Sequence, residues 1–152
     1  MIFLPIQSIW KILAKIVLVD TGPIVALIDR RDSKHTWASA MMDTFDAPMV
    51  TCTAVITEAI FLLSHANHGV ETLFSFIDEG IIQVENPYPS LKDLIHRHIL
   101  KYQNISPSLA DLCLIAMAEQ QEDSKIFTID SDFLVYRDSR GNMNDLISPY
   151  KS

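Results

Sequence analysis

The sequence predicts an α/β fold built on a mainly parallel sheet, and three observations support this prediction. Apolar stretches of strand length alternate with helical patterns along the chain. Residues 16–19 are consecutive branched apolar residues, which is typical of a strand buried on both faces. Residues 125–129 form another short apolar run, and both runs are followed directly by an aspartate. In a parallel sheet these strand ends would meet at one edge.

Composition bounds the size and class of the protein. A chain of 152 residues with 49% hydrophobic residues can bury one sizeable core, so we expect residues 15–152 to form a single domain. The 20% of charged residues argues against disorder or a fibrous repeat. Cys52 and Cys113 lie in apolar sequence without metal-ligand spacing, so we expect reduced core thiols in a cytoplasmic protein.

Residues 1–14 precede the first predicted strand and are rich in apolar side chains. The apolar run is short and Pro5 interrupts it, so it does not predict a membrane span. It also lacks the basic start and the small-residue cleavage site of a secretory signal. We therefore expect an N-terminal extension of unknown role, either an extra packing segment or the product of a wrongly assigned start.

Helices and further strands are predicted to follow the first strand in alternation. We expect helices at 23–28, 36–42, 54–65, 70–78 and 91–101, and strands at 49–53 and 81–85. The loop 29–35 carries Arg30, Arg31 and Lys34. This basic loop is either solvated surface or a contact for an anionic ligand.

The helix predicted at 91–101 has a weakly basic face. His96 and His98 stand two positions apart, and residues at that spacing do not share a helix face. We therefore expect solvated surface here and no metal site.

The C-terminal third of the chain begins with a helix signal. Ser106 followed by Pro107 predicts a cap and a first-turn residue, for a helix that runs to residue 119. The strand at 125–129 comes next, and residues 136–152 are expected to be a loosely structured finish.

Asp20 follows the first predicted strand directly. Ligands of open α/β sheets bind outside the carboxyl ends of the strands, so this position favours a functional role. The alternative is structural, because Asp20 or Thr21 can cap the following helix with a side-chain oxygen. Asp130 repeats the layout two residues after Thr128, so two acids would lie at one edge of the sheet.

Two further acids stand alone in apolar sequence. Glu58 is the single Asp, Glu, Lys or Arg in residues 47–70, and Asp111 is the single one in residues 102–118. Burying an unpaired charge is costly, so each is expected to have a partner, a metal ion or a shifted pKa. The alternatives are that Glu58 reaches solvent at the edge of its helix, and that the helix N-terminus alone favours Asp111.

These acids predict a metal site if they converge, because converging carboxylates cannot all be ionised without compensating charge. Hard oxygen ligands suit Mg²⁺ or Mn²⁺, which keep waters and bind substrate phosphates. One or two such ions would support hydrolysis of a phosphodiester bond. They would also reconcile a nucleic-acid substrate with a net charge of −7, from 12 basic and 19 acidic side chains.

Four stretches, in this order, resemble the PIN-domain nucleases of the VapC type, toxins of bacterial toxin–antitoxin pairs. They are Val-Leu-Val-Asp20-Thr-Gly-Pro, Thr-Glu58-Ala-Ile-Phe-Leu-Leu, Leu-Ala-Asp111-Leu-Cys-Leu-Ile-Ala-Met-Ala and Thr128-Ile-Asp130-Ser-Asp132-Phe. The resemblance covers residues 16 to 137 and implies a three-layer α/β/α sandwich. It implies an acidic, metal-binding set of Asp20, Glu58, Asp111 and Asp130, with Asp132 as a candidate fifth member and Thr21 and Thr128 in support.

The resemblance also implies an activity and partners. It implies a cytoplasmic, metal-dependent endoribonuclease that uses one or two Mg²⁺ or Mn²⁺ ions, is often homodimeric and is held inactive by a cognate antitoxin. Arg30, Arg31 and Lys34 would then be candidate RNA contacts. Proteins of this kind usually begin just before the first strand, so residues 1–14 depart from the family pattern.

Two alternatives remain. A catalytically silent PIN-like module would bind a protein partner without cleaving RNA. An aspartate-based phosphotransfer domain would also place Asp20 after a buried strand, but a haloacid-dehalogenase pattern needs an aspartate at the position of Gly22. A receiver domain needs paired acids before its phosphorylated aspartate and a lysine after a later strand, and neither is evident in that order.

Overall fold

The centre of the structure is a parallel sheet. The computed structural model describes residues 16–150, and within this range the strand order is β3-β2-β1-β4-β5 with every neighbouring pair parallel. The strands are β1 (Ile16–Val19), β2 (Met49–Cys52), β3 (Ile82–Glu85), β4 (Ser124–Phe127) and β5 (Leu146–Ile147). The extension predicted for residues 1–14 lies outside the described residues.

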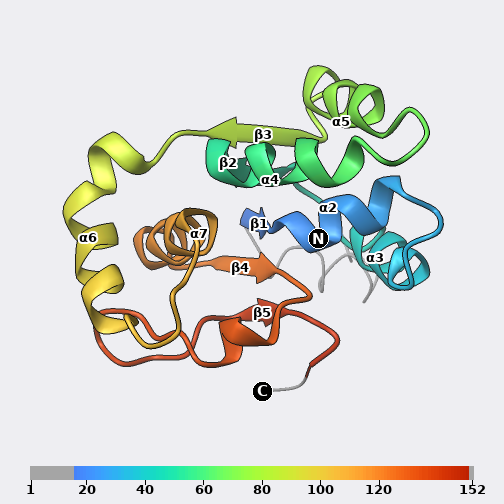
Figure 1. The fold of residues 1–152 in the computed structure, drawn as a ribbon. Helices are drawn as coiled ribbons and strands as arrows, with labels where there is room; N and C mark the ends of the chain where they lie inside the picture. The colour runs from blue at the N-terminus through green and yellow to red at the C-terminus, as the bar shows by residue number, and fades with distance from the viewer. Residues whose placement is uncertain (1–15, 151–152) are drawn as a thin grey trace, which may run out of the picture.

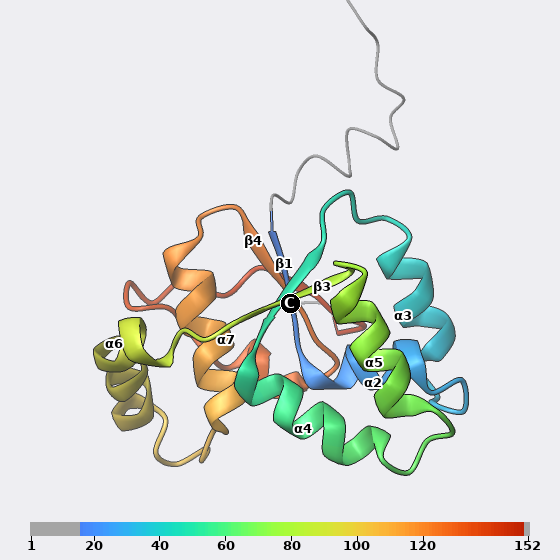
Figure 2. The same cartoon turned by 90° about the horizontal axis from the view of Figure 1, so that it is seen from above.

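Helices cover both faces of this sheet. In the described range they are α2 (Thr21–Ile28), α3 (His35–Met42), α4 (Thr53–Leu63), α5 (Gly69–Asp78), α6 (Tyr88–Lys101), α7 (Leu109–Gln120) and the short 3₁₀ helix η1 (Ser131–Leu134). Helices α6 and α7 lie on one side of the sheet, and α2, α3 and α5 lie on the other (Figures 1 and 2). The predicted α/β/α sandwich is confirmed. No helix within residues 16–150 combines the length and apolar content needed to cross a bilayer.

The core is organised on β1, which lies between β2 and β4. Both faces of β1 are covered, which explains its uninterrupted run of branched apolar residues. The residues predicted to form this buried centre are at most 2% exposed: Val17, Leu18, Val19, Ile126 and Phe127. The rings of Trp37 and Phe45 pack on Phe127, with centroid distances of 5.4 Å and 5.2 Å. Cys52 and Cys113 are buried free thiols, as predicted.

The start of α7 differs from the prediction. The helix begins at Leu109 and its N-cap is Ser108, whose hydroxyl accepts a hydrogen bond from the backbone N–H of Asp111 at 3.1 Å. Ser106, the predicted cap, has a φ of 52° and lies outside the helix. The prediction was wrong because Pro107 lies before the cap here, while Ser108 has the three-residue spacing to a first-turn N–H that a cap requires.

The C-terminal segment has more regular structure than predicted. Its strand β5 extends the parallel sheet, with Leu146 beside Ile126 and Ile147 beside Phe127. Tyr136, at the start of this segment, is fully buried. The expectation of a loose finish was wrong because a strand of two residues has no periodicity that a sequence pattern can reveal.

The face of α6 predicted to be solvated is only partly so. His96, Arg97 and Lys101 are exposed, but His98 is 2% exposed. Nε2 of His98 lies 3.5 Å from Oε2 of Glu119 on α7. Burial lowers the pKa of His98, against the opposing effect of the Glu119 carboxylate. The prediction was wrong for His98 because α6 packs on α7 and the side chain of His98 is turned toward Glu119 of α7.

Shortening Val19 to alanine tests the central placement of β1. We expect Val19→Ala to lower the free energy of unfolding by roughly 1–3 kcal/mol, because a fully buried side chain loses burial and leaves a cavity. The matched control is Val84→Ala in the edge strand β3, where the side chain is 39% exposed. The control should change stability by less than about 0.5 kcal/mol. Equal losses in urea denaturation of the two variants would contradict this placement.

Candidate active site

Asp20 lies where β1 ends and α2 begins. Its backbone N–H donates to the carbonyl of Phe127 at 2.9 Å, which extends the pairing of β1 with β4 by one residue. Its carboxylate accepts hydrogen bonds from the N–H of Thr21 at 2.7 Å and from the hydroxyl of Thr128 at 2.8 Å. Asp20 is 6% exposed. It is therefore the N-cap of α2 and, at the same time, a buried acid at the carboxyl edge of the sheet.

Thr128 joins the ends of the two central strands. Its hydroxyl donates to Asp20, and the same oxygen accepts a hydrogen bond from the backbone N–H of Asp130 at 3.0 Å. Asp130 in turn accepts from the N–H of Asp132 at 2.9 Å and caps η1. Asp130 and Asp132 are exposed, so they lie at the rim of the site, whereas Asp20 lies at its base.

Glu58 and Asp111 reach the same region from α4 and α7. Both residues are half-buried. Oε2 of Glu58 accepts a hydrogen bond from the hydroxyl of Thr21 at 2.9 Å. Oδ2 of Asp111 accepts one from the hydroxyl of Tyr136 at 2.9 Å. Each lone acid therefore has a hydroxyl donor as a partner, in line with the cost of leaving a carboxylate unpaired.

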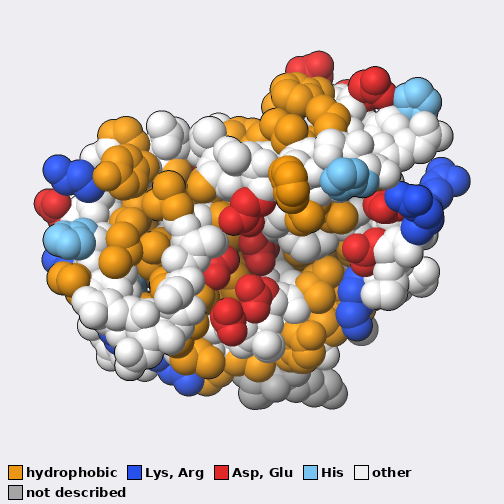
Figure 3. All heavy atoms as spheres, in the orientation of Figure 1, with side chains coloured by type: hydrophobic (Ala, Val, Ile, Leu, Met, Phe, Trp, Pro, Cys, Tyr) orange, Lys and Arg blue, Asp and Glu red, His pale blue; other side chains and the backbone are white. Residues whose placement is uncertain are grey.

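The structure brings the four predicted acids into one electrostatically coupled group. Asp20 interacts with Asp111 and Asp130, and Asp111 interacts with Asp130 and Glu58. Figure 3 shows acidic side chains gathered at the centre of one face, over the region where α4, α7 and the ends of β1 and β4 meet. Asp132 lies beside this group, where its charge acts on Tyr136.

Burial perturbs the two inner acids of this acidic cluster. The pKa of Asp20 is raised to about 7, chiefly by burial; the hydrogen bonds from Thr128 and Thr21 oppose this rise, and the charges of Asp111 and Asp130 add to it. Burial also raises the pKa of Asp111 to about 6, with contributions from Asp130 and Glu58. Without a compensating cation, the folded protein therefore favours the protonated form of both groups more than the unfolded chain does.

The donor set fits a hard divalent cation in its chemistry. Carboxylate oxygens are ligands of Mg²⁺ and Mn²⁺, and a cation would relieve the repulsion around Asp20 and Asp111. Within residues 16–150, no three His, Cys, Asp or Glu side chains are arranged as a ready-made metal group. Mg²⁺ usually binds through one or two carboxylates and keeps several waters, so its binding does not require such a group.

The basic residues predicted to contact RNA lie outside the acidic cluster. Nε of Arg31 donates to the Asp29 carboxylate at 3.2 Å, and its Nη2 donates to the carbonyl of His65 at 3.4 Å. Arg30 and Arg31 line a hollow beside Ala66 and Asn67. Figure 3 shows Lys and Arg side chains toward the edges of the face whose centre holds the acids. Contact of Arg30, Arg31 and Lys34 with RNA stays a prediction.

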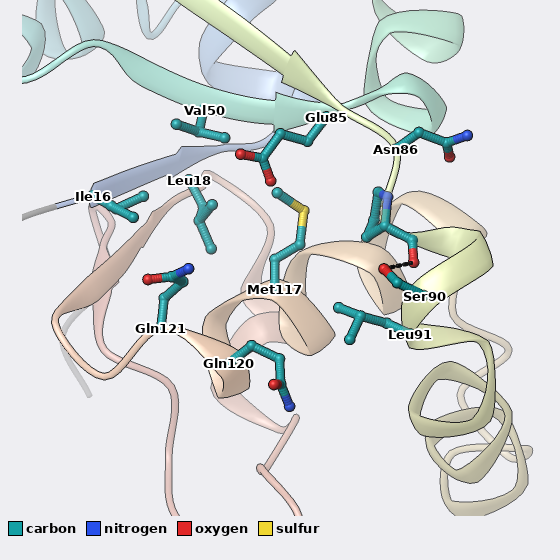
Figure 4. Close-up of a pocket in the computed structure, with 11 residues that line it drawn as sticks. Ile16, Leu18, Val50, Glu85, Asn86, Ser90, Leu91, Met117, Gln120 and Gln121 are labelled. Carbon is teal, nitrogen blue, oxygen red and sulfur yellow. Dashed lines mark hydrogen bonds between the residues drawn. The ribbon is translucent and has the colours of Figure 1, made fainter.

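A separate hollow of about 250 Å³ lies over the sheet, away from the acids. Figure 4 shows it between the sheet and α7, with Leu18, Val50 and Met117 among the apolar residues around it. Glu85 is its charged lining residue, and none of the predicted acids lines it. The candidate chemistry therefore belongs to the carboxyl edge of the sheet and not to this hollow.

Sequence reasoning missed two residues of the site, Ser108 and Tyr136. Ser108 stands three positions before Asp111, a capping pattern that the sequence contains and that could have identified it. Tyr136 has no such signal, because its contact with Asp111 spans 25 residues and exists only once the chain has folded.

These features define a class: a parallel α/β sandwich with a cluster of acids at the carboxyl edge of its central strands. The family model for the PIN domain matches residues 17–138, and the chain belongs to this family. No curated protein matches the chain in sequence.

Solved structures share the fold. The crystal structure of VapC20 from Mycobacterium tuberculosis, described as a sarcin–ricin loop cleaving toxin, aligns with a TM-score of 0.68 and 18% identity over 76% of this chain and 91% of that chain. The crystal structure of VapBC2 from Rickettsia felis, bound to a DNA fragment from the promoter, aligns with a TM-score of 0.60 and 13% identity over 88% of this chain and 98% of that chain. At these identities the similarity shows a common fold.

Replacing Asp20 with asparagine tests the electrostatic state of the cluster. Without divalent metal, we expect Asp20→Asn to be more stable than the wild type at pH 8, because the wild type must then keep a disfavoured charge buried. The folded pKa is raised to about 7 from 3.8, so this advantage should shrink as the pH falls through that window. Urea denaturation in EDTA at pH 8, 6 and 4.5 measures the difference.

The free energies of unfolding of the wild type and of Asp20→Asn must be compared at each pH, because other groups titrate as well. His98, whose pKa is lowered, is present in both proteins, so its effect on stability cancels in the difference. The amide oxygen of asparagine can still accept the hydrogen bond from Thr21. An Asp20→Asn variant that is less stable than the wild type at every pH would show that the folded protein does not disfavour the charge of Asp20.

Proposed function

We propose that this protein is a divalent-metal-dependent endoribonuclease that hydrolyses phosphodiester bonds of single-stranded or structured RNA, as the toxin of a toxin–antitoxin pair. The observation that carries the proposal is the coupled cluster of Asp20, Glu58, Asp111 and Asp130 at the carboxyl edge of the sheet. Membership of the PIN domain family supports it.

Charge explains why a cation is part of the proposal. The chain has a net charge of −7, and an acidic cluster by itself repels phosphate. A divalent cation between the carboxylates and the phosphate changes the sign of the local field. It also favours the ionised forms of Asp20 and Asp111, which burial disfavours. With the cation, an acidic protein is compatible with an RNA substrate.

The acids have different places in the proposed metal site. Asp20 and Asp111 would be inner ligands, because burial raises the pKa of each and each faces the charges of two other acids of the cluster. Glu58 and Asp130 would complete the anionic set, with Asp132 at the rim as a candidate fifth member. When bound, Mg²⁺ or Mn²⁺ supplies a Lewis acid for the scissile phosphate and for the attacking water.

Thr21 and Thr128 would hold two of these carboxylates in place. Thr128 donates to Asp20 and Thr21 donates to Glu58, and a hydroxyl donor favours the ionised form of the acceptor. Each contact also removes rotational freedom from a side chain that must present its oxygens to the site. The two threonines would therefore prepare carboxylates of different elements for one cation.

Partners follow from the resemblance to VapC toxins. VapC20 is described as cleaving the sarcin–ricin loop, which supports RNA as the substrate class here. We propose a cognate antitoxin as the protein partner, a homodimer as the assembly and the cytoplasm as the location. Arg30, Arg31 and Lys34 are the proposed contacts to the RNA backbone, since phosphates attract cationic side chains.

A catalytically silent PIN-like module is the second candidate. The observation in its favour is that residues 16–150 contain no ready-made group of three metal-ligating side chains. Such a module would use the same fold to bind a protein partner, and its acids would not be needed for that role. Cleavage of RNA by the purified protein separates the two candidates.

Replacing Asp111 with asparagine tests the nuclease mechanism. We expect Asp111→Asn to lower the rate of Mn²⁺-dependent cleavage of RNA by roughly a hundredfold or more, because the cation loses one negative ligand and several kcal/mol of transition-state stabilisation. The melting temperature in EDTA should stay the same or rise, since one member of a repelling cluster is gone.

The matched control is Asp93→Asn, which removes one negative charge from an exposed position on α6. The control should cleave RNA at the wild-type rate. Wild-type cleavage that persists in EDTA, or an Asp111→Asn variant as active as the control, would rule out the proposed mechanism.

A further inference from the structure

Tyr136 adjoins the acidic cluster and is 0% exposed. Its ring meets that of Tyr102 at a centroid distance of 5.1 Å and an interplanar angle of 71°. It meets the ring of Phe133 at 5.3 Å and 89°. Edge-to-face packing on these two neighbours restricts the orientation of the phenol ring.

The hydroxyl of Tyr136 donates to Oδ2 of Asp111 at 2.9 Å. Asp111 lies in the first turn of α7, whereas Tyr136 follows η1, the helix that Asp130 caps. The hydrogen bond therefore ties one acid of the cluster to the chain segment that carries another. A hydrogen bond to an ionised acceptor is about twice as strong as a neutral one.

The backbone beside Tyr136 is fixed by contacts of its own. The hydroxyl of Tyr102, the residue that follows α6, donates to the carbonyl of Arg137 at 3.1 Å, and the N–H of Arg137 donates to the same hydroxyl. The guanidinium of Arg137 donates to the carbonyls of Leu134 and Tyr136 at 2.7 Å and 3.0 Å. The donor that faces Asp111 is therefore held at a fixed place.

We propose that Tyr136 is a positioning residue that fixes the orientation of the Asp111 carboxylate within the acidic cluster. The role rests on the proposed function, because it is the orientation of a metal-binding carboxylate that matters. Asp130 and Glu58 both repel Asp111, which is half-buried and would relieve this repulsion by rotating toward solvent. A hydrogen bond from a fixed donor opposes that rotation.

A purely structural explanation makes different predictions. A buried tyrosine hydroxyl needs a hydrogen-bond partner, and Asp111 could serve only to provide one. In that case loss of the hydroxyl would change stability but would not change the Asp111 carboxylate or the steps that depend on it. Outer partners that orient ligating carboxylates instead affect metal affinity by about 10- to 100-fold.

The test uses two variants of the full chain. Tyr136→Phe removes the hydroxyl and keeps the packed ring. The control Ser124→Ala removes a buried hydroxyl at the start of β4, the end away from the acidic cluster, where Ser124 donates to the carbonyls of Ala118 at 3.3 Å and Gln121 at 2.7 Å. Each variant is crystallised, titrated with Mn²⁺ by calorimetry without RNA, and assayed for kcat and KM on RNA.

For Tyr136→Phe, we expect the Asp111 carboxylate to rotate in the crystal structure. The dissociation constant for Mn²⁺ should rise about tenfold or more. The value of kcat should fall by about tenfold to a hundredfold while KM stays within about twofold. Ser124→Ala should have a lower melting temperature but wild-type Mn²⁺ affinity and kcat.

An unrotated Asp111 in Tyr136→Phe would overturn the positioning role, whatever the activity. Equal losses of kcat in both variants would also overturn it, because they would indicate a general effect of lost stability. If the wild type cleaves no RNA, the proposed function fails, but the crystal structures still decide whether Tyr136 orients Asp111.

Discussion

The gathering of four carboxylates, one buried and two half-buried, at one edge of a parallel sheet is the constraint on which the rest of this structure depends. β1 and β4 are neighbours, and each ends beside an aspartate, with the Thr128 hydroxyl linking the two ends. The apolar core holds these strands in place, so their carboxyl ends cannot separate without disrupting it. The free-energy cost of keeping these carboxylates ionised in the folded protein appears in the raised pKa values of Asp20 and Asp111. Because a bound cation would offset the repulsion between these carboxylates, the site favours cation binding.

Much of the fold and of the candidate site was predictable because the relevant signals are local. The branched run of β1 indicates a buried strand, and the alternation of strand and helix patterns indicates a parallel α/β sheet. Glu58 and Asp111 stand out because each is a single charge in a long apolar stretch. These signals do not depend on which elements pack together, so they can be recognised in the sequence without the tertiary structure. The prediction that the acids converge rested on the expectation that the carboxyl ends of parallel strands lie at one edge of the sheet.

The features that were missed depend on contacts between distant parts of the chain. His98 is buried because α6 packs on α7, and no pattern within α6 indicates that packing. β5 forms only because β4 offers it a partner. Tyr136 and Asp111 stand 25 positions apart in the sequence, and their contact forms only in the folded chain. The misplaced start of α7 has a different cause: Ser106 and Ser108 both have cap chemistry, and the prediction followed the Ser106-Pro107 pair instead of the capping pattern of Ser108 and Asp111.

The most direct test of the shared cation site is a crystal soaked in Mn²⁺ and measured near the manganese absorption edge. A single or paired anomalous peak is expected at the carboxyl edge of the sheet, within coordination distance of Asp20 and of at least one of Glu58, Asp111 and Asp130. Coordination distance here means roughly 2.0–2.3 Å from a carboxylate oxygen. A fully soaked crystal with no peak at this edge, or with peaks only at other surface acids, would contradict the account.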